Sequence, residues 1–158
     1  MQRSRVSRRD VPVARGEVGA DGSESGTMTC PVCGAHTVAF AVPSALREHA
    51  PGSGGHAAIC TNCLRTHAVG GDAVDGPSDF AAVHSAFPDG EAGAALALSL
   101  GLLNSLALRR DDIDDCCAYA ERAGADVLLT LDRLAAEEGI DPHVDVDRRR
   151  HQLAEMLR

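Results

Sequence analysis

The hydrophobic and polar positions of this chain change their period near residue 70, from an alternating pattern to a helical one. Between Thr37 and Val42, alternate residues Val38, Phe40 and Val42 fall on one face, which is typical of a half-buried strand, and Pro43 ends the run. The first part therefore predicts a small sheet. Its other expected pieces are one helical turn at 44–49, a flexible loop at 51–55, and short strands at 57–59 and 66–69.

Beyond residue 78, apolar residues recur at helical spacing. The strongest predicted helix, residues 91–108, carries leucines around most of its circumference, which indicates burial on several sides. The predicted fold class is α+β: a small ribbon of short β-strands and two Cys knuckles, followed by an all-α region of about four helices. The remaining helices are expected from Ser78 to Ala86, from Asp111 or Asp112 to Gly124, from Asp126 to Gly139, and from Asp145 onward.

Composition divides the chain into four consecutive segments. Residues 1–27 are polar and aperiodic, so we expect a disordered N-terminal extension, with Met28 as the hypothetical natural start of the protein. Residues 28–70 are then the ribbon, residues 71–78 a linker rich in Gly and Asp, and residues 79–158 the helical region.

Charge narrows the classes of partner. All 15 basic residues are Arg, and 23 acidic residues give a net charge of −8. Residues 28–158 hold ten Arg and nineteen acids, a net charge of −9, which favours a solubility role for the acidic surface and disfavours nucleic acid. The longest apolar stretch, 94–108, is shorter than the ~20 residues of a membrane span. We therefore expect a soluble, cytoplasmic protein.

Two Cys-x-x-Cys pairs are the most specific signal in the chain. Two such turns can bring four thiolates around one Zn²⁺, each at about 2.3 Å. In a reducing compartment, paired cysteines indicate a metal site before they indicate disulfides. A set of four protein ligands leaves no position for substrate or water, so the predicted site is structural. Its ligands are Cys30, Cys33, Cys60 and Cys63.

The two cysteine turns differ in their support. Pro31 and Gly34 favour the first turn, because proline fixes φ and glycine tolerates a positive φ, whereas the second turn has neither residue. Two alternatives stay open. Iron could replace zinc, and one of three nearby histidines could replace a cysteine: His36, His56 or His67.

Three other groups of residues match no specific metal-binding or catalytic motif. Cys116 and Cys117 are adjacent on a predicted helix and are expected to be core residues. The acidic run 111–115 lies at a helix start, where carboxylates are favoured, and lacks the spacing of a calcium loop. The cluster Arg148 to Arg150 is expected to form an ion-paired face, with nucleic acid or an acidic protein partner as alternatives.

The residues from Met28 to Pro43, the second cysteine pair and the helical tail resemble a family of small haloarchaeal CPxCG-type zinc-ribbon proteins of uncharacterised function. The likeness covers roughly residues 28–158 and implies zinc at the four cysteines and a halophilic archaeal source. The composition agrees with that source, because the chain contains Arg but no Lys and has many acidic residues. The tail residues that carry the likeness are Phe87, Pro88, Gly101 to Leu103, Ala123 to Asp126, and Asp132 to Leu134.

No catalytic constellation is recognisable, so we expect a non-enzymatic protein. The leading hypothesis is a protein–protein adaptor or regulatory factor that contacts a partner, or a second copy of itself, through the Leu-rich helix 91–108. The alternative is a transcription-related, nucleic-acid-binding regulator, because zinc ribbons often serve that role. An enzyme or redox carrier is the third and weakest hypothesis.

Overall fold

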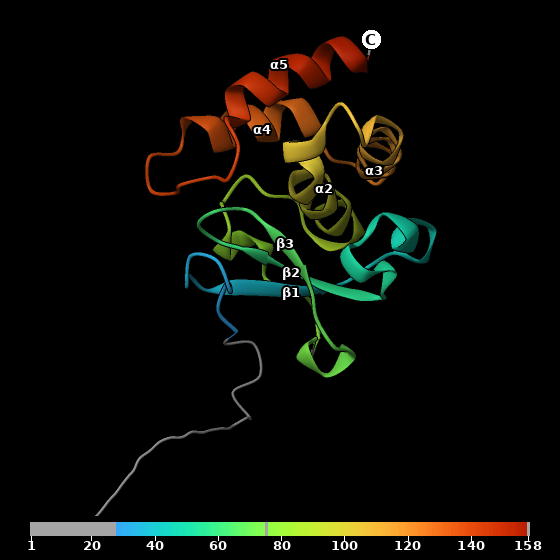
Figure 1. The fold of residues 1–158 in the computed structure, drawn as a ribbon, viewed down its shortest axis with the longest axis vertical. Helices are drawn as coiled ribbons and strands as arrows, with labels where there is room; N and C mark the ends of the chain where they lie inside the picture. Colours follow the sequence, from blue (N-terminus) through green and yellow to red (C-terminus); the bar gives the residue numbers. More distant parts are fainter. Residues whose placement is uncertain (1–27, 75, 158) are drawn as a thin grey trace, which may run out of the picture.

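The computed structural model describes residues 28–74 and 76–157, and it has the α+β architecture expected (Figure 1). Three antiparallel strands form one sheet in the order β1-β2-β3. The strands are β1 (Thr37–Ala41), β2 (His56–Cys60) and β3 (Thr66–Ala68). The helices are α2 (Gly90–Leu102), α3 (Arg110–Arg122), α4 (Val127–Ala136) and α5 (Val146–Met156). Short 3₁₀ turns lie at Ser44–His49, Pro51–Ser53, Gly71–Ala73, Phe80–Ala82 and Leu103–Ser105.

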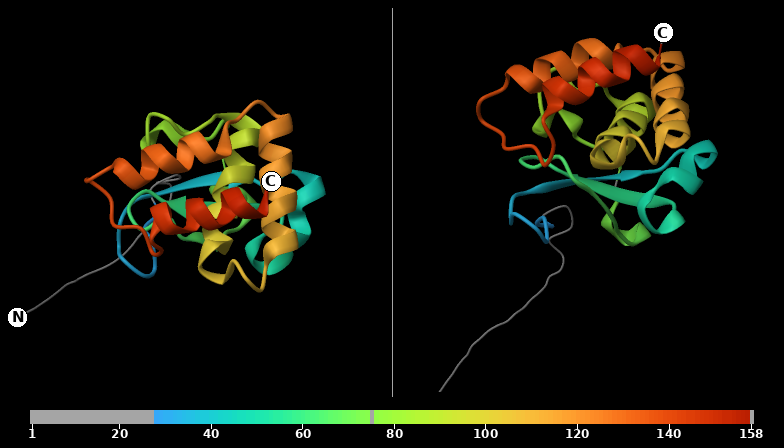
Figure 2. Two further views of the ribbon diagram at one scale, coloured as in Figure 1. Left: turned by 90° about the horizontal axis from the view of Figure 1, so that it is seen from above. Right: turned by 45° about the horizontal axis from the view of Figure 1, so that its top comes forward.

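The α-helices of the described residues, α2 to α5, lie on one side of the sheet (Figure 1). Helix α2 lies next to the strands and packs against both β3 and α3. Helices α4 and α5 lie side by side in a further layer, on the side of α2 away from the sheet (Figure 2). Among the described residues, no helix combines the length and apolar character needed to cross a membrane.

The alternation predicted for the first strand is confirmed. Val38 and Phe40, and Val42 just beyond the strand, are all buried on the face that the helices cover. Phe40 contacts Phe80 with ring centroids 5.6 Å apart, and Phe80 in turn stacks on Phe87 at 5.3 Å. The aromatic residues thus fasten the sheet to the segment that leads into α2.

Helix α2 is the centre of the protein. Residues Ala92 to Leu100 are all buried, as the spread of leucines around the helix predicted. Close approach to its neighbours depends on two glycines. A Cβ at Gly101 would lie 2.8 Å from the Cβ of Thr66 on β3, and one at Gly93 would lie 2.3 Å from the carbonyl oxygen of Pro88.

The predicted helix 91–108 is too long. The α-helix ends at Leu102 and continues as the 3₁₀ turn Leu103–Ser105. Asn104 and Ser105 lie in this turn, and both residue types are less favourable in a helix interior than the alanines and leucines that precede them.

The capping residues predicted for the helices are correct at two helix starts and wrong at a third. Asp126 and Asp145 cap α4 and α5 as predicted, with their carboxylates accepting from the N–H groups of Leu129 and Arg148. The prediction that Asp111 or Asp112 caps α3 is wrong. Arg109 occupies the cap position of α3, and its guanidinium, which can only donate, makes no side-chain cap. Asp111 and Asp112 lie inside the first turn, and Asp112 contacts the side chains of His49 and Arg109.

Two further helix boundaries differ from the prediction. Helix α4 ends at Ala136 rather than running to Gly139, with Glu137 in an extended conformation. The helix expected from Ser78 to Ala86 is reduced to the single turn Phe80–Ala82. Ser78 does not cap it, because its hydroxyl donates to the carbonyl oxygen of Ala39 at 2.7 Å.

One continuous apolar core joins the sheet to the helices. It runs from Val38 and Ile59 on the strands, through Leu96 on α2, to Leu153 on α5. The boundaries 28–70, 71–78 and 79–158 stay a prediction, but the two sides of the expected linker bury their apolar residues against each other. The expected disorder of residues 1–27 lies outside the described residues.

Candidate metal centre

The four predicted ligands lie on two turns with matching backbone geometry. In the first turn, the N–H of Gly34 donates to the carbonyl oxygen of Cys30 at 2.9 Å. In the second, the N–H of Leu64 donates to the carbonyl oxygen of Cys60 at 3.2 Å. Both turns therefore end in the same way, although their sequences differ.

The residue that follows the second cysteine of each turn has a positive φ, which is 81° at Gly34 and 63° at Leu64. A left-handed conformation costs a leucine about 1 kcal/mol or more. Leu64 is fully buried in the apolar core, and burying a leucine contributes roughly 1.5–3 kcal/mol. Core packing thus holds the second turn in the shape that glycine allows in the first. This role of Leu64 was not predicted, although its spacing from Cys60 could have indicated it.

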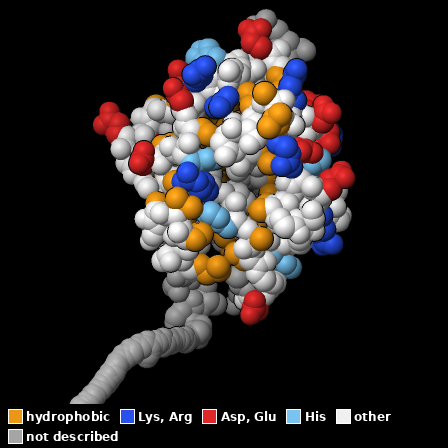
Figure 3. Space-filling model, in the orientation of Figure 1, with side chains coloured by type: hydrophobic (Ala, Val, Ile, Leu, Met, Phe, Trp, Pro, Cys, Tyr) orange, Lys and Arg blue, Asp and Glu red, His pale blue; other side chains and the backbone are white. Residues whose placement is uncertain are grey.

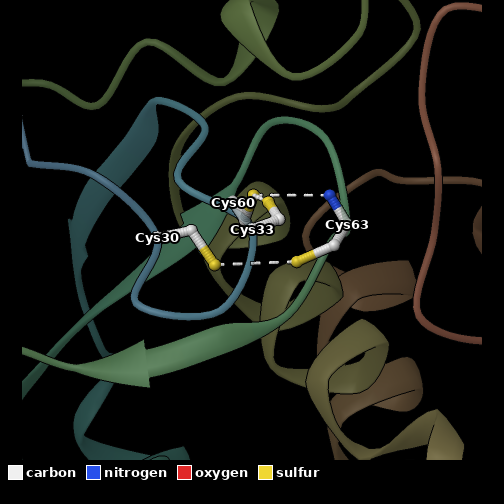
Figure 4. A group of neighbouring side chains, drawn as sticks. All are labelled: Cys30, Cys33, Cys60 and Cys63. Carbon is white, nitrogen blue, oxygen red and sulfur yellow. Dashed lines mark hydrogen bonds between the residues drawn. The ribbon is translucent and has the colours of Figure 1, made fainter.

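The two turns bring the four sulfurs together at one end of the sheet (Figure 4). The Sγ atoms of Cys30 and Cys63 are 3.7 Å apart, those of Cys33 and Cys60 are 3.4 Å apart, and all four lie within 4.8 Å of one another. A tetrahedron with Zn–S bonds of about 2.3 Å has sulfurs separated by about 3.8 Å. The two distances of 3.7 and 3.4 Å are close to this value, so the four sulfurs could hold such an ion.

Backbone N–H groups point at the sulfurs, as expected for a site that holds thiolates. Val32 donates to the Sγ of Cys30 at 3.4 Å, and Asn62 and Cys63 both donate to the Sγ of Cys60 at 3.3 Å. These bonds spread the negative charge of a tetrathiolate over the peptide groups, which is part of how a protein holds such a site.

The thiols differ in acidity. A backbone hydrogen bond from Ala35, and then the neighbouring Cys60 thiol, lower the pKa of Cys33 to about 6. Burial raises the pKa of Cys60 to about 12, against the opposing effect of its N–H donors. Burial also acts to raise the pKa of Cys30, but N–H groups of Cys33 and Val32 outweigh it and the pKa lies below its usual value. The exposed Cys33 therefore ionises more readily than the buried Cys60.

Two polar side chains surround the cluster without joining it. The Nε2 of His67 lies 3.4 Å from the Sγ of Cys30, and the Nδ2 of Asn62 lies 3.8 Å from the Sγ of Cys33. Burial, and then the charge of Arg65, lower the pKa of His67, which keeps the ring neutral. With its proton on Nε2, the ring donates to the Cys30 thiolate.

The second turn is fixed to the helical layers through its backbone. The carbonyl oxygen of Asn62 accepts from the N–H of Asp141 at 3.0 Å, and that of Cys63 accepts from the N–H of His143 at 2.8 Å. The ring of His143 reaches the carbonyl oxygen of Leu100 on α2 at 3.1 Å. The segment between α4 and α5 thus ties the cysteine cluster to the helices.

The remaining sequence candidates lie apart from this cluster. Of the three histidines, only His67 lies within hydrogen-bonding distance of a cysteine sulfur among the described residues, and no histidine joins the four-sulfur group. Cys116 and Cys117 are fully buried in the core on α3, as predicted, and burial raises the pKa of each to about 12. Their thiols are accordingly protonated and inert near neutral pH.

Comparison with known proteins gives one match. The model of a family of unknown function (DUF6276) matches residues 29–157, which includes the four cysteines and all four helices. No curated protein and no solved structure matches the chain.

Proposed function

Since the chain belongs to the family of unknown function DUF6276, we propose a function from the site itself: the four cysteines hold one structural Zn²⁺. The observation that carries this proposal is the convergence of four sulfurs, from two turns of like geometry, within 4.8 Å. On the resemblance described above, we place the chain among the small haloarchaeal CPxCG-type zinc ribbons.

Zinc suits this donor set better than the hard divalent cations, because thiolates are soft ligands and Zn²⁺ favours tetrahedral sulfur coordination. Four protein ligands complete that coordination, so the ion has no open position for water or substrate. The ion would therefore hold the two turns together and supply no chemistry of its own. This supports a protein that is not an enzyme.

Replacement of the metal by Co²⁺ tests the ligand set. A cobalt tetrathiolate should give intense thiolate-to-metal absorption at a stoichiometry of one ion per chain. The variant Cys63→Ser should lower that intensity, because it removes one of four sulfur ligands. Cys116→Ser makes the same chemical change outside the cluster and should leave the intensity unchanged. Weak bands of the kind given by oxygen and nitrogen ligands would reject the proposal.

We further propose that the protein is an adaptor or regulatory factor that binds another protein, or itself, through the segment 91–108. Most of this segment is buried within the chain, and its exposed part is the C-terminal end, where Leu108 is 87% exposed. Beside it lies a cavity of about 290 Å³ lined by Leu106 and Met156 together with Arg110 and Arg149. An apolar side chain flanked by carboxylates would complement this surface.

Pull-down from native cells at native salt, after nuclease treatment, tests the adaptor proposal. A captured protein should be lost with Leu108→Ser, which removes an exposed side chain at little expected cost in stability. Leu129→Ser is the matched control, because Leu129 is an exposed leucine on α4, away from this cavity. Equal capture by wild type and both variants would place the partner surface elsewhere.

A nucleic-acid-binding regulator is the second candidate function, and zinc ribbons in general support it. The net charge of −9 after Met28 opposes it. On the face shown in Figure 3, acidic side chains lie mostly around the edge, and Arg residues are interspersed with hydrophobic ones rather than gathered into one stripe. Retention on DNA or RNA that falls steeply with salt would favour this candidate over the adaptor.

A further inference from the structure

A second group of metal-ligating side chains lies where the turn Ser44–His49 packs against α3, away from the cysteines. It contains Glu48, His49 and Asp115, whose ligand atoms all lie within 4.8 Å of one another. The imidazole of His49 is buried, with 5% of its surface exposed, whereas Glu48 and Asp115 are 79% and 59% exposed. A buried ring thus faces carboxylates that open to solvent.

The orientation of the His49 ring is fixed from its other side. Its Nδ1 lies 2.8 Å from Oδ1 of Asp112, and the other carboxylate oxygen of Asp112 accepts from Nε of Arg109. That guanidinium holds the pKa of Asp112 below its usual range, so the carboxylate is ionised and can only accept. The proton of this hydrogen bond therefore resides on Nδ1 of His49.

A neutral imidazole with its proton on Nδ1 has a lone pair on Nε2. The Nε2 of His49 lies 3.2 Å from Oδ2 of Asp115 and 3.7 Å from Oε2 of Glu48. In this state Nε2 of His49 and the two carboxylate oxygens all carry lone pairs and no hydrogen. Their close approach therefore requires a cation between them or a second proton on the ring. A chain of a carboxylate, a histidine and a metal is a recurrent arrangement, in which the carboxylate sets the tautomer and strengthens the ligand.

We propose that Nε2 of His49 and the carboxylates of Glu48 and Asp115 bind one divalent transition-metal cation, with Asp112 and Arg109 as positioning residues. With metal–ligand distances of about 2.1 Å, donor atoms lie about 3.0 Å apart at right angles and about 3.4 Å apart in a tetrahedron. The separations of 3.2 and 3.7 Å are close to this range.

One imidazole and two carboxylates form a donor set of intermediate hardness, which suits Mn²⁺, Fe²⁺ or Zn²⁺ bound with water in the remaining positions. This differs from the closed set of four thiolates. Such an ion would join the turn Ser44–His49 to the second turn of α3. The proposal is independent of the metal at the cysteines.

Binding of Mn²⁺ to the zinc-loaded full-length protein tests the proposal, because Mn²⁺ is too hard to displace zinc from thiolates. The electron paramagnetic resonance signal of free Mn²⁺ should decrease with a stoichiometry of one ion per chain. Glu48→Gln and Asp115→Asn should each weaken binding about ten-fold or more. Asp112→Asn, which leaves all three ligands in place, should weaken it about 10–100-fold.

Asp114→Asn is the matched control, because it removes the same charge from the same helix outside the cluster. Its affinity for Mn²⁺ should stay within about two-fold of the wild type. Absence of Mn²⁺ binding would mean that a second proton on His49 fills the gap, and it would overturn the proposal. Equal weakening by Asp114→Asn and Asp115→Asn would also overturn it, since it would indicate diffuse attraction by the acidic surface. The carboxylates of Glu48, Asp114 and Asp115 are exposed and that of Asp112 is partly exposed, so these variants are expected to fold.

Discussion

Replacement of a single cysteine ligand should destabilise the whole protein, helices included. The most informative change is Cys30→Ser, on the turn that lies farther from the helical layers. Cys30 is 3% exposed, and serine is nearly the same size, so the substitution removes little packing. The effect on stability therefore comes from the metal.

The expected loss of stability is estimated from the number of metal ligands. Structural zinc in small modules contributes about 10–16 kcal/mol, so one ligand of four accounts for about 3 kcal/mol. Each kcal/mol shifts the melting temperature of a domain of this size by about 3–5 °C. The melting temperature of Cys30→Ser should thus fall by about 10–15 °C.

Thermal unfolding followed by circular dichroism at 222 nm is the appropriate assay, since that signal comes mainly from α2 to α5. The helices should unfold at the lowered temperature for two reasons. Their core is continuous with the sheet, and the backbone N–H of His143 donates a hydrogen bond to the carbonyl oxygen of Cys63. Val32→Ser is the control, an exposed change in the same turn with an expected effect within about 0.5 kcal/mol. An unchanged helical transition in Cys30→Ser would refute the reasoning.

Two further predictions concern packing and protons. Gly93→Ala should destabilise the protein by about 1–2 kcal/mol in urea denaturation, because the new Cβ meets the Pro88 carbonyl at 2.3 Å and overpacking outweighs the gain in helix propensity. Gly54→Ala, where the Cβ meets nothing within 4 Å, should be neutral or slightly stabilising. Zinc binding near neutral pH should release fewer than four protons, because Cys33 is already ionised with a pKa of about 6, whereas Cys60, with a pKa of about 12, must lose its proton. Calorimetry in buffers of different ionisation enthalpy measures this number, and a release of four protons would contradict the assigned acidity of Cys33.

The same two thiols set opposite trends of stability with pH in the metal-free protein. The lowered pKa of Cys33 gives a contribution that is present above the usual thiol pKa and is lost as the pH falls through about 6. The raised pKa of Cys60 gives one that is present below the usual thiol pKa and is lost as the pH rises through about 12. Urea denaturation of the metal-free protein should therefore show stability declining toward both extremes. Stability that rises as the pH falls from neutral to below 6 would contradict this account of Cys33.

Local signals in the sequence predicted much of the structure. The alternation of Val38 and Phe40 gave the first strand, and the caps Asp126 and Asp145 gave the starts of two helices. The spacing of the cysteines brought together the four candidate ligands. Each of these features depends on residues close in the chain or on a recurrent metal-binding turn.

Features that depend on tertiary contact were not predictable in this way. Leu64 adopts a positive φ because the core holds it. Its spacing from Cys60 matches that of Gly34 from Cys30, but leucine as a residue type does not indicate a left-handed conformation. Asp112 does not cap α3 because it binds His49, which lies 63 residues earlier in the chain. The acidic run was interpreted from the helix alone, and only the folded chain places it beside an imidazole.

The central claim is that one zinc ion, held by four cysteines, maintains this fold. Its most direct test is metal analysis of the full-length protein purified at native salt without added metal, by inductively coupled plasma mass spectrometry. We expect one zinc and no iron per chain, with the zinc content retained in Val32→Ser and reduced in Cys30→Ser. Iron in place of zinc, or a zinc content unaffected by Cys30→Ser, would contradict it.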